Sequence, residues 1–84
     1  MATPASDFTE AARDCAGLIT LLHRALADHV ARYGSDPDWA AVGDLTSLRH
    51  RLYEALIPTR NCLSEGEALA EIDILVRQVR PARV

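Results

Sequence analysis

The chain has 84 residues, of which 49% are hydrophobic and 25% charged. These fractions are typical of a globular domain and exclude a disordered or collagen-like chain. Nine basic residues, all of them Arg, stand against twelve acidic residues, for a net charge of -3. An acidic balance disfavours binding to a phosphate backbone or to an anionic membrane.

Aromatic residues make up only 5% of the chain, so a core has to be built from Leu, Ile, Val and Ala. Small aliphatic side chains of this kind favour closely packed helices over sheets. We therefore predict a single all-α domain over residues 1–84. A chain this short buries only about 60% of its unfolded surface, so a partner subunit would add stability.

The first predicted helix spans about residues 6–33. Ser6 or Thr3 fits its N-cap, and Gly34 is expected to end it in the left-handed conformation. Leu18 and Leu21 widen its apolar face to roughly half of the cylinder. That face recurs at steps of three and four and consists of Phe8, Ala12, Cys15, Ile19, Leu22, Leu26, Val30 and Tyr33.

The second predicted helix spans about residues 37–57. Asp36 suits its N-cap and Pro37 its first helical position, while Pro58 disfavours helical backbone at the residue before it and should end the helix. Gly43 weakens the prediction of an unbroken helix, and Asp44 fits the cap of a restart. The apolar stripe consists of Val42, Leu45, Leu48, Leu52, Ala55 and Leu56.

The third predicted helix spans about residues 64–80. Ser64 and Glu67 form a capping box, and Leu63 is placed to pack against Ala68 as a hydrophobic staple. Pro81 ends the helix. Its apolar stripe consists of Ala68, Leu69, Ile72, Leu75, Val76 and Val79.

Short connections between three helices predict an up-down-up bundle. At 1.5 Å per residue the helices would be roughly 40, 30 and 24 Å long, so two shorter helices leave part of the first helix uncovered. A second copy of the chain is the simplest cover. We therefore expect a homodimer built along the first helix.

No pattern in the chain predicts a metal or cofactor site. His23 and His29 lie six residues apart, on different sides of a helix, and the sequence contains no Cys-x-x-Cys, His-x-x-x-His or Glu-x-x-His motif. For His29 we expect a hydrogen bond to a carbonyl or exposure at the bundle end. Cys15 lies on an apolar face, where a thiol acts as a small hydrophobe. Cys62 precedes a predicted helix N-terminus and follows Arg60 closely, so a reactive thiol there is an alternative to a packed one.

Two residues break the helical pattern. Arg49 lies within the apolar arc of the second helix, either snorkelling at the bundle edge or paired with a carboxylate such as Asp14, Asp73 or one from a partner. Ile74 points away from the stripe of the third helix. Together with Ala70 it is either ordinary exposed surface or a small second contact face.

These patterns predict a small non-enzymatic interaction or regulatory protein that acts through protein–protein contacts, with itself as the first partner and another protein as a further one. The first residues show no secretory signal pattern and no segment is long and apolar enough to cross a membrane, so we expect a cytoplasmic protein. The exclusive use of Arg and the Ala-rich composition are typical of a GC-rich bacterial genome. The candidate partner contacts are Leu18, Leu21, Arg49, Tyr53 and Ile74.

Two alternatives stay open at this point. The first is a DNA-associated regulator that forms its basic surface as a dimer, although the start of its third helix would bring Glu65, Glu67 and Glu71 to the DNA. The second is a ligand-binding helical bundle or small enzyme that uses Arg49, Tyr53 and His29 around one pocket.

Overall fold

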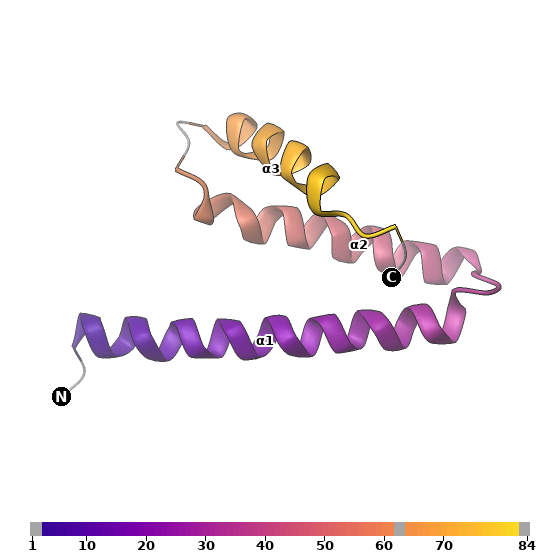
Figure 1. The fold of residues 1–84 in the computed structure, drawn as a ribbon, viewed down its shortest axis with the longest axis horizontal. Coiled ribbons are helices and arrows are strands. Elements are labelled where there is room, and N and C mark those ends of the chain that lie inside the picture. Colours follow the sequence, from indigo (N-terminus) through magenta and orange to yellow (C-terminus); the bar gives the residue numbers. More distant parts are fainter. Residues whose placement is uncertain (1–2, 62–63, 83–84) are drawn as a thin grey trace. The chain divides into compact units, whose positions relative to one another are not determined.

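The structure is a computed structural model that describes residues 3–61 and 64–82. The chain divides into two compact units, Met1–Ser35 and Asp36–Val84. The first unit contains one long helix, and the second contains the other helices of the chain (Figure 1).

The predicted all-α class with three α-helices is confirmed, and no strand occurs within residues 3–61 and 64–82. A short 3-10 helix, η1, separates the second α-helix from the third. The elements are α1 (Pro4–Tyr33), α2 (Trp39–Leu56), η1 (Ile57–Thr59) and α3 (Glu65–Val79).

Helix α1 begins two residues earlier than the apolar pattern indicated. Thr3, one of the two predicted N-caps, has extended backbone, and its hydroxyl oxygen accepts a hydrogen bond from the backbone N–H of Ser6 at 3.1 Å. Pro4 then occupies the first helical position, where its missing N–H has no consequence.

The predicted left-handed conformation of Gly34 is wrong. Its φ of -66° and ψ of -28° are right-handed, and its N–H donates to the carbonyl of Val30 at 2.7 Å. Gly34 thus completes the last helical turn. A Cβ at this position would collide with the carbonyl oxygen of Val30, so close backbone approach favours glycine here.

The predicted start of α2 is also wrong. Asp38, not Asp36, is the N-cap: its backbone is extended and its Oδ1 accepts from the N–H of Ala41 at 2.8 Å. Helix α2 therefore begins at Trp39, and Pro37 precedes the cap instead of opening the helix. The physical reason is local, because the side chain that reaches the free N–H groups of the first turn defines the cap.

Helix α2 then runs without a break. The backbone continues through Gly43, so no restart occurs at Asp44. The helix ends at Leu56, one residue before the predicted end, and Pro58 lies in η1. The N–H of Arg60 donates to the carbonyl of Ile57 at 3.1 Å and closes this short turn.

The predicted cap of α3 is confirmed. Ser64 has extended backbone, and its hydroxyl oxygen accepts from the N–H of Glu67 at 3.2 Å. Helix α3 ends at Val79, two residues before Pro81. The predicted staple residue, Leu63, lies outside the described residues.

Helix α3 packs on α2 within the second unit, and few residues form the core there. Ala68 and Ile72 of α3 are each only 2% exposed, and they lie four residues apart on one face of the helix. The small side chain of Ala68 allows close approach, while full burial of an Ile contributes roughly 2 kcal/mol. Four further residues of the predicted stripes in this unit are half-buried, namely Leu45, Leu48, Leu69 and Val76.

The assignment of the α2 cap predicts a difference between two neighbouring aspartates. Asp38→Ala should lower the free energy of unfolding by about 1 kcal/mol, because the N–H of Ala41 loses its acceptor. Asp36→Ala is the matched control, and it should change stability by less than about 0.5 kcal/mol. Urea denaturation of both variants measures the effect. Equal losses, or a larger loss for Asp36→Ala, would contradict the assignment.

Candidate functional site

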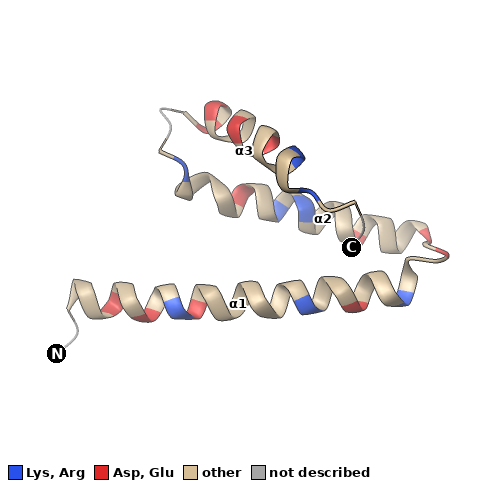
Figure 2. Ribbon diagram, in the orientation of Figure 1, with Lys and Arg blue, Asp and Glu red and all other residues tan. Residues whose placement is uncertain are grey.

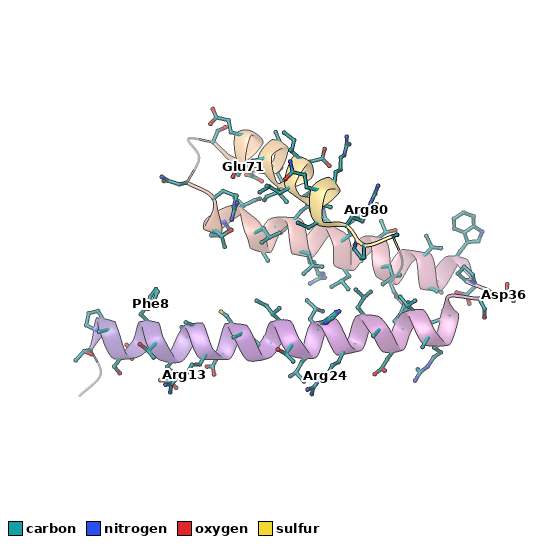
Figure 3. The ribbon with its side chains drawn as sticks, in the orientation of Figure 1. Phe8, Arg13, Arg24, Asp36, Glu71 and Arg80 are labelled. Atoms are coloured by element: carbon teal, nitrogen blue, oxygen red, sulfur yellow. The ribbon has the colours of Figure 1, made fainter. Side chains whose placement is uncertain are left out.

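Helix α1 exposes several large apolar side chains. No residue of α1 is buried, and Leu18 and Leu21, both predicted as partner contacts, are 64% and 59% exposed. Phe8 and Ile19 on the neighbouring stripe expose 76% and 67%. Figure 3 shows Phe8 on one side of α1 and Arg13 and Arg24 on the other. A helix that is apolar on one side and exposes its largest apolar residues is typical of a binding element.

The C-terminal part of the same face carries two rings in tilted contact. His29 and Tyr33 lie one turn apart with ring centroids 4.8 Å from each other and a tilt of 54°. The Nε2 atom of His29 is buried and has no hydrogen-bond partner among the described residues. The hydrogen bond that the sequence predicted is therefore not formed at this nitrogen.

Asp73 connects the two helices of the second unit. The hydroxyl of Tyr53 donates to Asp73 Oδ1 at 3.3 Å, and Asp73 Oδ2 pairs with Arg77 at 3.2 Å. Near the turn, Arg60 Nη1 lies 3.2 Å from Glu71 Oε1. Tyr53, predicted as a partner contact, is thus half-buried and contributes to packing within its own unit.

Arg49 is exposed on α2 and makes no ion pair within the described residues. The predicted pairing with Asp73 is wrong, because that carboxylate bonds to Tyr53 and Arg77 instead. An Arg stem can lie along apolar surface while its guanidinium stays in water, which was the other interpretation of this residue.

The exposed apolar residues of the second unit include one that the sequence did not single out. Trp39, at the first position of α2, is 87% exposed. Ile74 is 58% exposed beside the exposed Ala70, as the pattern of α3 predicted. Trp39 was missed because it lies outside the apolar stripe; its type and its place next to a cap were the available signs.

A shallow, open groove of about 640 Å³ lies between the end of α2 and the start of α3. Its polar groups include His50 and Glu54, whose Nε2 and Oε1 atoms lie 2.6 Å apart with side chains 76% and 60% exposed. A pair this exposed is solvated and contributes little to stability. The groove is lined by His50, Tyr53, Glu54, Ile57, Pro58, Glu65 and Leu69.

The groove does not gather the residues of the predicted ligand pocket. Tyr53 lines it, Arg49 does not, and His29 belongs to the other unit. Within the described part of the chain, no three His, Cys, Asp or Glu side chains are grouped to hold a metal ion. Cys15 is exposed on α1, and Cys62 lies outside the described residues.

Comparison with known proteins found no matching family model, no matching curated protein and no matching solved structure. None of the described helices combines the length and the hydropathy that a membrane span requires. The candidate site is therefore an exposed surface, and α1 contributes Phe8, Leu18, Ile19 and Leu21 to the exposed apolar residues.

The contact between Tyr53 and Asp73 predicts a structural effect. Tyr53→Phe should lower the free energy of unfolding by about 1 kcal/mol, since a half-buried hydrogen bond to a carboxylate is lost. Tyr33→Phe removes the same hydroxyl group from α1 and should have no effect beyond about 0.5 kcal/mol. Urea denaturation of both variants checks this, and equal midpoints for Tyr53→Phe and the wild type would contradict the hydrogen bond.

The exposure of Arg49 predicts that its charge contributes nothing to folding. Arg49→Met should leave the thermal midpoint unchanged or raise it, because the apolar part of the side chain is kept. Arg60→Met is the comparison: it removes the ion pair with Glu71 and should destabilise by up to about 1 kcal/mol. A loss of roughly 3–5 kcal/mol in Arg49→Met would instead show that Arg49 has a buried partner.

Proposed function

We propose that this chain is a small non-enzymatic interaction protein that acts through helical surfaces, with α1 as its main binding element and a homodimer as its assembled form. One observation carries the proposal. Helix α1 has 30 residues, a continuous apolar face and no buried residue. Isolated helices are marginally stable in water, and most helical stability in proteins comes from packing of the apolar face.

The magnitude of the exposed surface supports association over a solvated helix. Phe8, Leu18, Ile19 and Leu21 each expose more than half of their surface. Full burial of such a side chain contributes roughly 1.5–3 kcal/mol. In a homodimer every such contribution occurs twice, and the sum is comparable to the estimated 4–15 kcal/mol that association costs in lost freedom of motion.

The polar groups of the second unit give less support to an enzyme. Enzyme sites commonly hold their titratable groups in buried surroundings beside other charges. In the groove at the end of α2, His50 and Glu54 are instead exposed and satisfy each other. The ligand-binding alternative would need Arg49 at this groove, and Arg49 does not line it.

The DNA-binding alternative has less support from the charges. Glu65 and Glu67 occupy the first turn of α3, the part of a recognition helix that reaches base edges (Figure 2). Two carboxylates at that position would repel the phosphates that line the major groove of DNA. A protein partner agrees better with a net charge of -3.

The proposal includes a reducing, bacterial cytoplasm as the setting. Two cysteines do not build a disulfide framework, and an Arg-only, Ala-rich composition is typical of GC-rich bacterial genomes.

Sedimentation equilibrium tests the assembly. The wild-type chain should sediment at roughly twice its 9.2 kDa mass at high micromolar concentration. Ile19→Asp should shift it to the monomer, because a buried carboxylate without a partner is strongly unfavourable in the apolar face. Thr20→Asp adds the same charge one position away, off the stripe, and should leave the dimer in place.

A wild-type chain that sediments as a 9.2 kDa monomer at high micromolar concentration would contradict the homodimer. Equal effects of Ile19→Asp and Thr20→Asp would show that the apolar face of α1 is not the contact.

A further inference from the structure

A heptad pattern also occurs in α1, and it differs from the apolar stripe by including Ala5 and by having His29 in place of Val30. Nine residues alternate at steps of three and four over four heptads, the 3.5-residue repeat with which two helices pack in a left-handed pair. We call these residues the seam. They are Ala5, Phe8, Ala12, Cys15, Ile19, Leu22, Leu26, His29 and Tyr33.

From this seam we propose that a second copy of the chain docks on α1 in antiparallel orientation and in one register, in which residue numbers that face each other add up to 41. The proposal rests on the homodimer proposed above and adds its orientation and contacts. The facing pairs, each formed twice by symmetry, are Phe8 with the partner's Tyr33, Ala12 with the partner's His29, Cys15 with the partner's Leu26, and Ile19 with the partner's Leu22.

Side-chain size favours this orientation. The small residues of the seam, Ala5, Ala12 and Cys15, lie in the N-terminal half of α1, and the C-terminal half carries only larger ones. In the antiparallel register each small residue at positions 12 and 15 faces a large one, so the layers interdigitate. In a parallel pair every residue faces its own copy. Ala12 and Cys15 would then leave space unfilled, while His29 would be pressed against the partner's His29.

Charge favours the same orientation. The N-terminal half of α1 carries three acidic residues and one Arg, and the C-terminal half carries two Arg and one Asp (Figure 2). Antiparallel pairing brings acidic halves against basic halves, whereas parallel pairing brings the two acidic halves together. The residues are Asp7, Glu10, Arg13 and Asp14 in the first half and Arg24, Asp28 and Arg32 in the second.

One charged contact follows from the register. Arg32 flanks the seam, and in the proposed pair the nearest flanking position on the same side of the partner is Ala11. On the helical wheel, Asp7 and Asp14 lie one turn before and one turn after Ala11 on the same side. The guanidinium of Arg32 is therefore placed to reach two carboxylates of the partner, and the symmetry of the pair forms this contact at both ends.

Disulfide trapping tests the register, because a disulfide requires Cα atoms closer than about 7 Å. In a Cys62→Ser background only Cys15 provides a thiol, and the antiparallel register keeps the two copies of Cys15 about 16 Å apart along the axis. Oxidised glutathione should thus not cross-link this variant. Adding Leu26→Cys places a second thiol opposite the partner's Cys15, and the same treatment should yield a covalent dimer linking positions 15 and 26.

The controls separate the orientation from the dimer itself. Tyr33→Cys in the same background faces the partner's Phe8 and should give no cross-link. Efficient linkage of Cys15 to the partner's Cys15, or of position 26 to position 26, would overturn the antiparallel register while leaving the dimer intact. A chain that sediments only as a monomer, with α1 covered by its own α2 and α3 or by a different protein, would overturn both proposals.

A charge exchange keeps the test decisive if the Leu26→Cys variant does not dimerise. Arg32→Glu should weaken the dimer roughly tenfold, since repulsion replaces attraction at both ends. Adding Asp7→Arg and Asp14→Arg to the same chain should restore the wild-type dissociation constant to within about threefold. Sedimentation gives these constants, and a lack of restoration would contradict the contact, because in a parallel pair position 32 lies roughly 27 Å or more from positions 7 and 14.

Discussion

The proposed assembly depends on the apolar face of α1. A helix of 30 residues exposes Phe8, Leu18, Ile19 and Leu21, and none of its residues is buried. Such a helix is only marginally stable in water by itself, because helix nucleation is unfavourable and each added residue contributes little free energy unless the apolar face is packed. We propose that a second copy covers this face, because the heptad spacing, side-chain sizes and charges of α1 are compatible with a copy running in the opposite direction.

In the second unit, apolar residues are covered by the packing of helices within that unit. Helices α2 and α3 pack on each other through Ala68 and Ile72, the two buried residues of α3. Polar contacts at the edge of this packing help to orient the helices: Tyr53 donates to Asp73, and Arg60 pairs with Glu71 near the 3-10 turn. These contacts are exposed or half-buried and contribute modestly. The contacts between α2 and α3 therefore mainly stabilise this unit itself.

The sequence predicted the helices well because apolar periodicity and capping chemistry are local. Thr3 and Ser64 cap α1 and α3 as the patterns indicated. The predicted start of α2 was wrong for a local reason too. Asp36 and Asp38 both suit an N-cap, and the preference of Pro37 for the first helical turn favoured Asp36. The predicted conformation of Gly34 was wrong because a glycine after a helix is compatible with right-handed backbone as well.

The surfaces were predictable only in part. The exposure of Leu18 and Leu21 follows from the width of the apolar face, which the sequence shows directly. The bond between Tyr53 and Asp73 depends on how α3 is aligned along α2, which no helical pattern specifies, and so the sequence left open whether Arg49 pairs with Asp73 or extends into water. A helical wheel gives the direction of a side chain but not what lies in that direction.

Hydrogen–deuterium exchange of the full chain as a function of concentration tests whether a second copy stabilises α1. Binding to the folded form stabilises it by mass action, so the protection of amides in residues 4–33 should rise over a roughly hundredfold increase in protein concentration. Amides of Trp39–Leu56 should serve as the internal reference and change less. Protection of α1 that is high and independent of concentration, in a chain that sediments as a monomer, would contradict the account.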